Sequence, residues 1–207
     1  IVSLCLLLST SSLFAREYHV TTTGNDAAAG SIEAPLRTIN RAAQLALPGD
    51  TITVHQGTYR EWINPLSGGE SDAKRILYRA ADGERVEVKG SETVTGWKRE
   101  KKNKQVWKLV LPNSFFCNYN PFNDRLYGDW LWSDKVHHTA DVFINDVSLY
   151  EAFSLDKVYA PDTLRTIRDP KGCTNVWFAE VDAENTTIYA NFGTVDPNKE
   201  VTEVSVR

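Results

Sequence analysis

Several short stretches in the first half of the chain are rich in β-branched and aromatic residues, and in some of them hydrophobic residues recur at every second position. Each stretch has four or five residues and is followed by turn residues: 17–21, 51–54, 76–79 and 86–89, with a further extended stretch at 59–63. This period is typical of β-strands, because successive side chains point to opposite faces of a sheet. Strands this short suit the rungs of a parallel β-helix, in which each coil stacks on the next. A mixed α+β domain is the alternative that the pattern leaves open.

A helical period interrupts these strands once. Apolar residues lie three or four positions apart there: Leu36, Ile39, Ala43 and Ala46. Pro35 suits the first position of a helix, and Pro48-Gly49 ends one. We therefore expect a short amphipathic helix over 35–47, and it would cover the exposed end of the β-helix as a cap.

Longer alternating stretches, separated by longer loops, fill the second half. Six of them predict strands: 106–111, 141–144, 147–150, 176–181, 187–192 and 201–206. Asn145-Asp146 between two of these is a hairpin-turn sequence, because both residue types tolerate a positive φ. Six strands at irregular spacing favour a β-sandwich. We therefore expect β-helix cap and rungs over 16–92 and a β-sandwich over 93–207.

The first fifteen residues have the pattern of an export signal. They carry no charge, and an apolar run fades into small residues that end at Ala15. The run is too short to span a membrane, which takes roughly 20 apolar residues. We expect 1–15 to be the remnant of a signal peptide whose Met and basic region are not in the sequence. The mature chain would then begin at Arg16 or a nearby residue, and the protein would be periplasmic or extracellular.

Composition and charge narrow the function classes. Hydrophobic residues make up 42% of the 207 residues, and the formal net charge is −4. These values exclude a disordered or collagen-like chain and a generally basic nucleic-acid-binding protein. We expect neither a nucleic acid nor a membrane as a partner.

Cysteine and histidine positions do not indicate a metal site. Cys5 belongs to the signal, and whether Cys117 and Cys173 pair is left open by the sequence. No Cys or His spacing matches a zinc site. His137 and His138 are adjacent, and on a strand their side chains would point to opposite faces. We expect no metal and no cofactor.

The loop 112–140 is long and aromatic. Long loops in compact domains are usually functional or disordered, and this one is too aromatic to be disordered. Sugar sites combine aromatic platforms with carboxylate and amide groups, because sugars present apolar C–H faces and rings of hydroxyls. This loop supplies both kinds of group. The candidate substrate-binding residues are Trp130, Asp129, Asn120 and Tyr119, and Trp130 is the strongest of them. Packing in the core is the alternative for the aromatic residues.

Several carboxylates lie near glycine or aromatic residues: Glu61, Glu70, Asp72, Asp129 and Asp134. A retaining glycosidase needs two carboxylates about 5–5.5 Å apart. For each of these five, however, a turn cap or an ion pair with Lys74 or Arg75 is the more ordinary role. The sequence therefore leaves the catalytic residues unknown.

Longer motifs resemble known families. Residues 18–61 resemble the N-terminal cap and first rung of pectate-lyase-like right-handed β-helix proteins. The stretches 62–72 (WINPLSGGESD), 74–91, 111–129 (LPNSFFCNYNPFNDRLYGD) and 187–207 resemble glycoside hydrolase family 120. That family comprises β-xylosidases and their relatives, with a β-sandwich inserted into the β-helix. The chain departs from it at Cys117, where a small Gly-like residue is expected.

The resemblance implies an all-β fold and a function. It implies the N-terminal part of an exported, exo-acting β-xylosidase that acts on an oligosaccharide or polysaccharide, with the catalytic carboxylates on later rungs, beyond Arg207. Association into a homo-oligomer is left open. A β-helical polysaccharide lyase and a non-catalytic carbohydrate-binding module are the alternatives.

Overall fold

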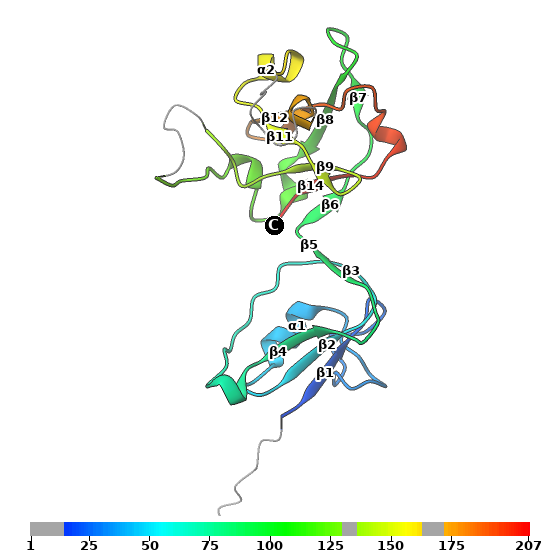
Figure 1. Ribbon diagram of the computed structural model, residues 1–207, viewed down its shortest axis with the longest axis vertical. Coiled ribbons are helices and arrows are strands. Elements are labelled where there is room, and N and C mark those ends of the chain that lie inside the picture. Colours follow the sequence, from blue (N-terminus) through cyan, green and yellow to red (C-terminus); the bar gives the residue numbers. More distant parts are fainter. Residues whose placement is uncertain (1–14, 130–135, 163–171) are drawn as a thin grey trace, which may run out of the picture. The chain divides into compact units, whose positions relative to one another are not determined.

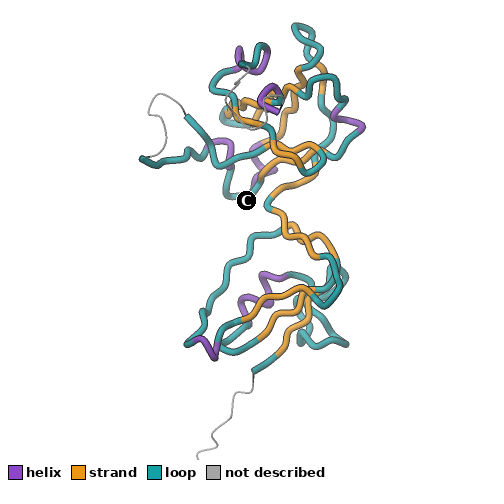
Figure 2. The backbone as a smooth tube through the Cα atoms, viewed as in Figure 1, coloured by secondary structure: helices purple, strands orange, loops and turns teal. Residues whose placement is uncertain are grey.

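The computed structural model describes residues 15–129, 136–162 and 172–207 (Figure 1). The described residues form mainly strands and loops, with a few short helices (Figure 2). The chain divides into two compact units, the first ending at Lys89 and the second beginning at Gly90.

The first unit contains two small parallel sheets. Strands β1 (Glu17–Val20), β2 (Thr51–Val54) and β4 (Leu77–Ala80) form one of them, and β3 (Gly57–Arg60) and β5 (Val86–Lys89) form the other. All neighbours pair in register, so that Tyr18 stands beside Ile52 and Ile52 beside Tyr78. Tyr59 and Val88 are likewise partners in the second sheet. Equivalent residues of successive strands therefore stack in ladders.

The helix of this unit begins later than the sequence predicts. Leu36 pairs with Val20 in a β-bridge, and its N–H donates to the His19 carbonyl at 2.9 Å, so this residue extends the sheet instead of a helix. Helix α1 (Ile39–Leu45) starts only after Thr38, whose Oγ1 accepts a hydrogen bond from the N–H of Arg41. The predicted bounds of 35–47 were therefore too wide at both ends.

Helix α1 packs against β1 and β2 (Figure 1). Its buried face is formed by Ile39, Ala42 and Ala43, which join Val20 and Ile52 of the strands in one apolar cluster. The small alanines allow the helix backbone to lie close to the sheet, and this explains why an amphipathic segment of only seven residues is stable here.

The second unit contains two sheets. A four-stranded sheet has the order β10-β9-β14-β6, and a five-stranded sheet has the order β11-β12-β13-β8-β7. The bounds are β6 (Ser91–Thr93), β7 (Lys98–Arg99), β8 (Val106–Pro112), β9 (Val142–Ile144), β10 (Val147–Ser148), β11 (Tyr150–Glu151), β12 (Val176–Val181), β13 (Asn185–Asn191) and β14 (Thr202–Ser205). Neighbouring strands are antiparallel except for β11 and β12.

One apolar cluster joins the two sheets of this unit. Val142 and Val204 enter it from the four-stranded sheet, and Trp177, Leu109 and Ile188 enter it from the five-stranded sheet. All five are buried. Burial of these side chains is the main stabilising contribution to the packing of the two sheets.

The hairpin predicted at Asn145-Asp146 is present. Both residues have positive φ values, 50° and 64°, and they connect β9 to β10. The stretch predicted as one strand over 147–150 is divided in the structure, because buried Leu149 separates β10 in one sheet from β11 in the other.

Some elements are too short to show a clear apolar period and were not predicted from the sequence. These are β6, β7 and the short helix α2 (Leu155–Tyr159), together with the 3-10 turns η1 (Asp72–Lys74), η2 (Asn113–Phe116), η3 (Pro121–Asn123), η4 (Gly172–Thr174) and η5 (Pro197–Lys199). In β6, a polar contact replaces apolar packing, since Ser91 Oγ donates to Glu203 at 2.9 Å.

Candidate functional site

The long aromatic loop is fixed at its base by pairing between its two sides. Arg125 and His138 form an antiparallel bridge, and the N–H of Leu126 donates to the carbonyl of His137 at 2.8 Å. The N–H of Thr139 donates to the carbonyl of Asp124 at 2.9 Å. We call residues 124–126 and 137–139 the arm base (Figure 1), and residues 127–136, which connect its two sides, the arm. Residues 130–135 of the arm lie outside the described residues.

Two aromatic residues anchor the loop in the core ahead of the arm. Phe116 and Phe122 are buried, their ring centroids lie 5.7 Å apart, and Phe122 meets the ring of Trp177 edge to face at 5.3 Å. Core packing therefore explains these two aromatic residues.

Tyr119, a predicted substrate-binding residue, braces the arm base. Its hydroxyl donates to Asp124 Oδ2 at 2.8 Å and lies 2.6 Å from Oγ1 of Thr139. Partial burial, with a smaller contribution from the Asp124 carboxylate, raises the pKa of Tyr119 above its ordinary value. The phenol therefore remains a neutral hydrogen-bond donor, and its donor and acceptor positions link the two sides of the arm base.

Asn120, the second predicted substrate-binding residue, also has structural partners. Its side-chain oxygen accepts from the N–H of Phe122 at 3.0 Å and so caps η3. Its amide nitrogen donates to Oγ1 of Thr186 at 2.8 Å, and that hydroxyl donates to Asn113 at 2.9 Å. Because both ends of the Asn120 amide are engaged in the fold, this side chain is better placed to support the loop than to bind a ligand.

The remaining two predicted site residues belong to the arm. Asp129 is exposed, as is Tyr127, which is 82% exposed. Trp130 lies outside the described residues, as does Asp134. The structure therefore brings Tyr119 and Asn120 together at the foot of the loop and leaves Asp129 on its solvent-facing part.

The carboxylate of Glu151 contacts two histidines of the arm base, and sequence reasoning missed this cluster. Glu151 Oε1 accepts from His138 Nδ1 at 2.6 Å, and Glu151 Oε2 lies 3.1 Å from His137 Nδ1 and accepts from the N–H of His138 at 2.9 Å. The Glu151 side chain is only 9% exposed. The expectation that adjacent histidines point to opposite faces was wrong, because His137 and His138 do not lie on a regular strand.

A cavity of about 280 Å³ opens beside this cluster. Its lining combines Glu151 and His137 with apolar and aromatic side chains, including Tyr150, Phe153 and Val176. The ring of His137 meets that of Phe153 edge to face, with 5.1 Å between the centroids. The cluster of Glu151, His137 and His138 therefore includes part of the arm base and part of the cavity wall.

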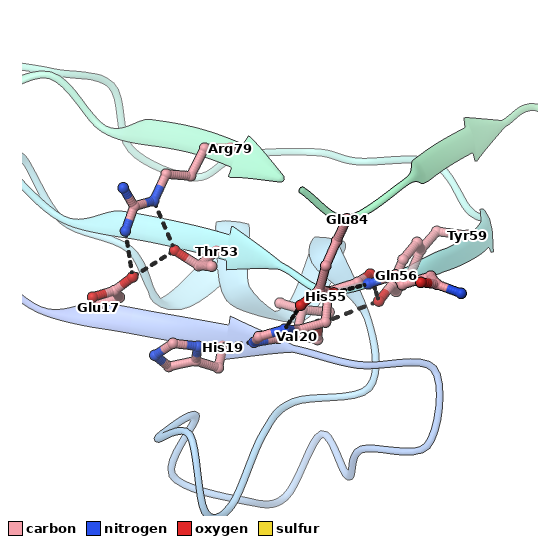
Figure 3. A network of polar contacts seen from close by, with 9 residues as sticks. All are labelled: Glu17, His19, Val20, Thr53, His55, Gln56, Tyr59, Arg79 and Glu84. Atoms are coloured by element: carbon pink, nitrogen blue, oxygen red, sulfur yellow. Dashed lines mark hydrogen bonds and ion pairs between the residues drawn. The ribbon is translucent and has the colours of Figure 1, made fainter. Parts of the chain in front are cut away.

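A second polar network lies in the first unit (Figure 3). Glu17, Thr53 and Arg79 come from β1, β2 and β4, and they are joined by hydrogen bonds of 2.6 to 3.0 Å. The hydrogen bonds from Thr53 and from Arg79 lower the pKa of Glu17. This network bridges the three strands of the sheet on one face.

A separate chain of polar contacts contains two histidines. Nδ1 of His19 lies 3.0 Å from Nε2 of His55, and Nδ1 of His55 lies 3.1 Å from Oε1 of Glu84 (Figure 3). The His rings are inclined by 22° with centroids 5.3 Å apart, which together with the short N···N distance means that they meet edge to edge. Glu84 also accepts from the N–H of Gln56 at 2.5 Å. The N–H of Gln56 and then His55 lower the pKa of Glu84.

The other carboxylates considered in the sequence have structural partners. Glu61 accepts from the N–H groups of Ile39 and Asn40, at 3.0 and 2.7 Å, and so caps α1. Glu70 pairs with Lys74, and Asp72 pairs with Arg75. A cap and ion pairs are the ordinary structural roles that we expected from the sequence as the alternative to catalysis.

Among the described residues, no group of three or more His, Cys, Asp or Glu side chains is placed to hold a metal ion. Within the same ranges, no helix is both long and apolar enough to cross a bilayer. Cys117 is exposed, Cys173 is buried, and no disulfide joins these two described residues.

Comparison with known proteins relates both units to carbohydrate-active enzymes. A solved structure of XylC in complex with xylose superimposes with a TM-score of 0.84 over 92% of this chain, at 43% sequence identity, and the match covers 32% of the XylC chain. Pectate lyase PEL9 of Emericella nidulans is 37% identical over 83 residues, which are 39% of this chain and 20% of the lyase. The uncharacterized protein YwoF of Bacillus subtilis is 33% identical over 72 residues, 35% of this chain and 15% of YwoF.

The chain thus spans about a third of the length of XylC and a fifth or less of the two other relatives. Residues 22–65 match a family of unknown function, DUF1565. Residues 94–204, more than half of the chain, match the insertion domain of glycoside hydrolase 120. The chain therefore belongs to glycoside hydrolase family 120.

Proposed function

We propose that this chain is part of an exported β-xylosidase that removes xylose units from the ends of oligosaccharides or polysaccharides. The observation that carries the proposal is the match to XylC, which extends over 92% of this chain at 43% identity. XylC was solved with xylose, and its likeness to this chain includes both units. A pentose-terminated glycan is therefore the proposed substrate class.

We further propose that the two parallel sheets of the first unit are rungs of a right-handed β-helix. Tyr18 and Ile52 are buried in their ladder, whereas Tyr78, the next residue of that ladder, is 38% exposed. Leu77 and Val88, on the outermost strands of the two sheets, are about half exposed. A further coil stacked on β4 and β5 would bury these apolar side chains, and the ladder hydrogen bonds of both strands would continue into it.

The catalytic carboxylates would then lie on rungs outside this chain, about 5–5.5 Å apart if the enzyme retains the anomeric configuration. In support, Glu61, Glu70 and Asp72 are engaged in a helix cap or in ion pairs. The arm, with Asp129 and Trp130, would supply contacts to the sugar from the inserted unit, of the same molecule or of a neighbouring subunit.

The test is hydrolysis of a chromogenic β-xyloside by the full-length protein. Release of the chromophore together with free xylose is the expected result. A polysaccharide lyase is the second candidate, favoured by the 37% identity to PEL9 over 83 residues. Formation of an unsaturated uronate product from pectate, with no cleavage of the xyloside, would instead assign the protein to that class. Binding of xylo-oligosaccharides without turnover would indicate a binding module.

Export is part of the proposal and rests on the charge-free segment 1–15. N-terminal sequencing of the protein recovered outside the cytoplasm should begin at Arg16 or close to it. A recovered protein that still carries residues 1–15 would contradict this.

A further inference from the structure

We propose that Glu151 is a positioning residue for substrate use: through His137 and His138 it fixes the arm base, and with it the direction in which the arm presents Asp129. This inference rests on the proposed function, because it assigns to the arm a contact with the sugar. Glu151 would not touch the substrate and would act only through the two histidines.

The backbone of Glu151 is held rigidly in a sheet. It lies on β11, which pairs in parallel with β12 in the five-stranded sheet. On either side of Glu151, the N–H of Tyr150 donates to the carbonyl of Asn175 at 3.0 Å, and the N–H of Ala152 donates to the carbonyl of Trp177 at 2.7 Å. The backbone of Glu151 is therefore held by the sheet, and its carboxylate is a fixed point.

Three hydrogen-bond contacts converge on the Glu151 carboxylate. A carboxylate only accepts hydrogen bonds, and here the three contacts at 2.6, 2.9 and 3.1 Å all come from His137 and His138. Because the side chain is 91% buried, water competes weakly for its oxygens, and charge-assisted hydrogen bonds are strong in such a place. These contacts select one orientation of residues 137–139 of the arm base.

The two sides of the arm base, residues 137–139 and 124–126, are coupled to each other. His138 is bridged to Arg125, the carbonyl of His137 accepts from Leu126, and Tyr119 ties Asp124 to Thr139. A displacement of His137 and His138 is therefore passed to residues 124–126, from which the arm departs. Substrate contacts on the arm would be misplaced even though the sheets were intact, and small misplacements of this kind can cost much activity.

The first unit offers a matched control. Glu84 accepts from one imidazole, that of His55, at 3.1 Å and from the N–H of Gln56, so it too combines imidazole and backbone donors. It lies at the turn between β4 and β5, away from the arm base along the chain. The variants to compare in the full-length protein are Glu151→Ala and Glu151→Gln with Glu84→Ala and Glu84→Gln.

Two measurements are needed. The first is the rate at which chymotrypsin cleaves after Tyr127, identified by mass spectrometry, because this residue is 82% exposed and lies directly beside the arm base. The second is KM and kcat on the chromogenic xyloside. Glu151→Ala should speed the cleavage several-fold and raise KM roughly tenfold, while kcat changes about twofold or less. A role in stability alone would not produce this separation of KM from kcat.

Glu151→Gln keeps the size of the side chain and one acceptor oxygen, so its KM should lie between that of the wild type and that of Glu151→Ala. It also keeps the test decisive if Glu151→Ala does not fold. The Glu84 variants should leave both KM and the cleavage at Tyr127 as in the wild type. Unchanged KM in folded Glu151 variants would overturn the inference, as would an equal rise in KM in the Glu84 variants. If the wild type does not cleave the xyloside, the proposed function fails, whereas an unchanged rate of cleavage at Tyr127 would refute the positioning role by itself.

Discussion

At the scale of single residues, the backbone at Cys117 conflicts with its side chain. Its φ of 54° and ψ of −116° lie in a region that glycine adopts readily and that a residue with a Cβ avoids. The position follows η2 and closes it, since the N–H of Cys117 donates to the carbonyl of Ser114. This is also the position at which family 120 motifs predict a small Gly-like residue, and the strain gives that preference a physical reason.

Cys117→Gly should therefore stabilise the protein. Relief of a disfavoured backbone conformation is worth of order 1–3 kcal/mol, reduced by the greater entropy that glycine adds to the unfolded chain. The free energy of unfolding from urea titration measures it. Cys117→Ala is the control, because it removes the thiol and keeps the Cβ, and an equal gain in that variant would show that strain is not the cause.

The Glu84 carboxylate leads to a pH-dependent prediction. Its pKa in the fold is lowered from the ordinary 4.5, so its stabilising contribution is present above that value and is lost as the pH falls through the lowered pKa. The difference in unfolding free energy between wild type and Glu84→Gln should accordingly be largest near neutral pH and should shrink as the pH falls below 4.5. Urea titrations across this range test it, and a difference independent of pH would contradict the role of the charge.

Trp130 remains the residue that the sequence singles out for sugar contact. If it is a platform, Trp130→Ala in the full-length enzyme should weaken kcat/KM by roughly 1–3 kcal/mol and leave the melting temperature unchanged. If it is a core residue, the same change should cost about 3–5 kcal/mol of stability. A large fall in melting temperature with unchanged kinetics would exclude the sugar contact.

At the scale of elements, helix α1 shows how a seven-residue helix is held at its start. Asp26 accepts from the N–H groups of Arg37 and Thr38, at 2.9 Å each, just before the helix. Glu61 accepts from the first two N–H groups of the helix itself. These N–H groups have no partner within the helix, and the carboxylates also interact favourably with its positive end.

Glu61→Ala should consequently destabilise the first unit by about 1–2 kcal/mol, the usual cost of a lost helix cap. Glu70→Ala removes a carboxylate that only pairs with Lys74 at the surface, and it should cost about 1 kcal/mol or less. Thermal unfolding of both variants tests the comparison. Equal losses would mean that Glu61 contributes only as a surface charge.

At the scale of the whole molecule, the two units differ in architecture. The first stacks short parallel strands in register, and the second packs two sheets around one apolar cluster and carries the arm. Neither unit has, among its described residues, a carboxylate pair that we assign to catalysis.

Residues 16–207 expressed alone should therefore fold and yet be inactive. Circular dichroism should show β structure with a cooperative transition, and the purified fragment should release no chromophore from a xyloside above a blank. Full-length protein assayed in parallel is the control. Turnover by the fragment would overturn the placement of the active site outside this chain.

Local patterns determined most of the strands. The stretches predicted over 51–54, 86–89 and 176–181 have the observed bounds of β2, β5 and β12, because β-branched and aromatic residues favour extended backbone. Asn145-Asp146 specified its own turn, since positive φ is a property of these residue types. Motifs over 62–91 and 111–129 were sufficient to indicate the family to which the chain belongs.

Only the tertiary structure decided how the loop residues are used. Leu36 fits a helical period, but its backbone pairs with Val20, because a strand already in place offers it partners. Tyr119 and Asn120 have the chemistry of sugar ligands, yet Tyr119 bonds to Thr139, 20 positions away, and Asn120 bonds to Thr186, 66 positions away. The cluster of Glu151 with His137 and His138 joins residues 13 and 14 positions apart, on the two sides of the β9–β10 hairpin. No local period encodes such contacts, because they arise only when separate segments are brought together by the packing of the sheets.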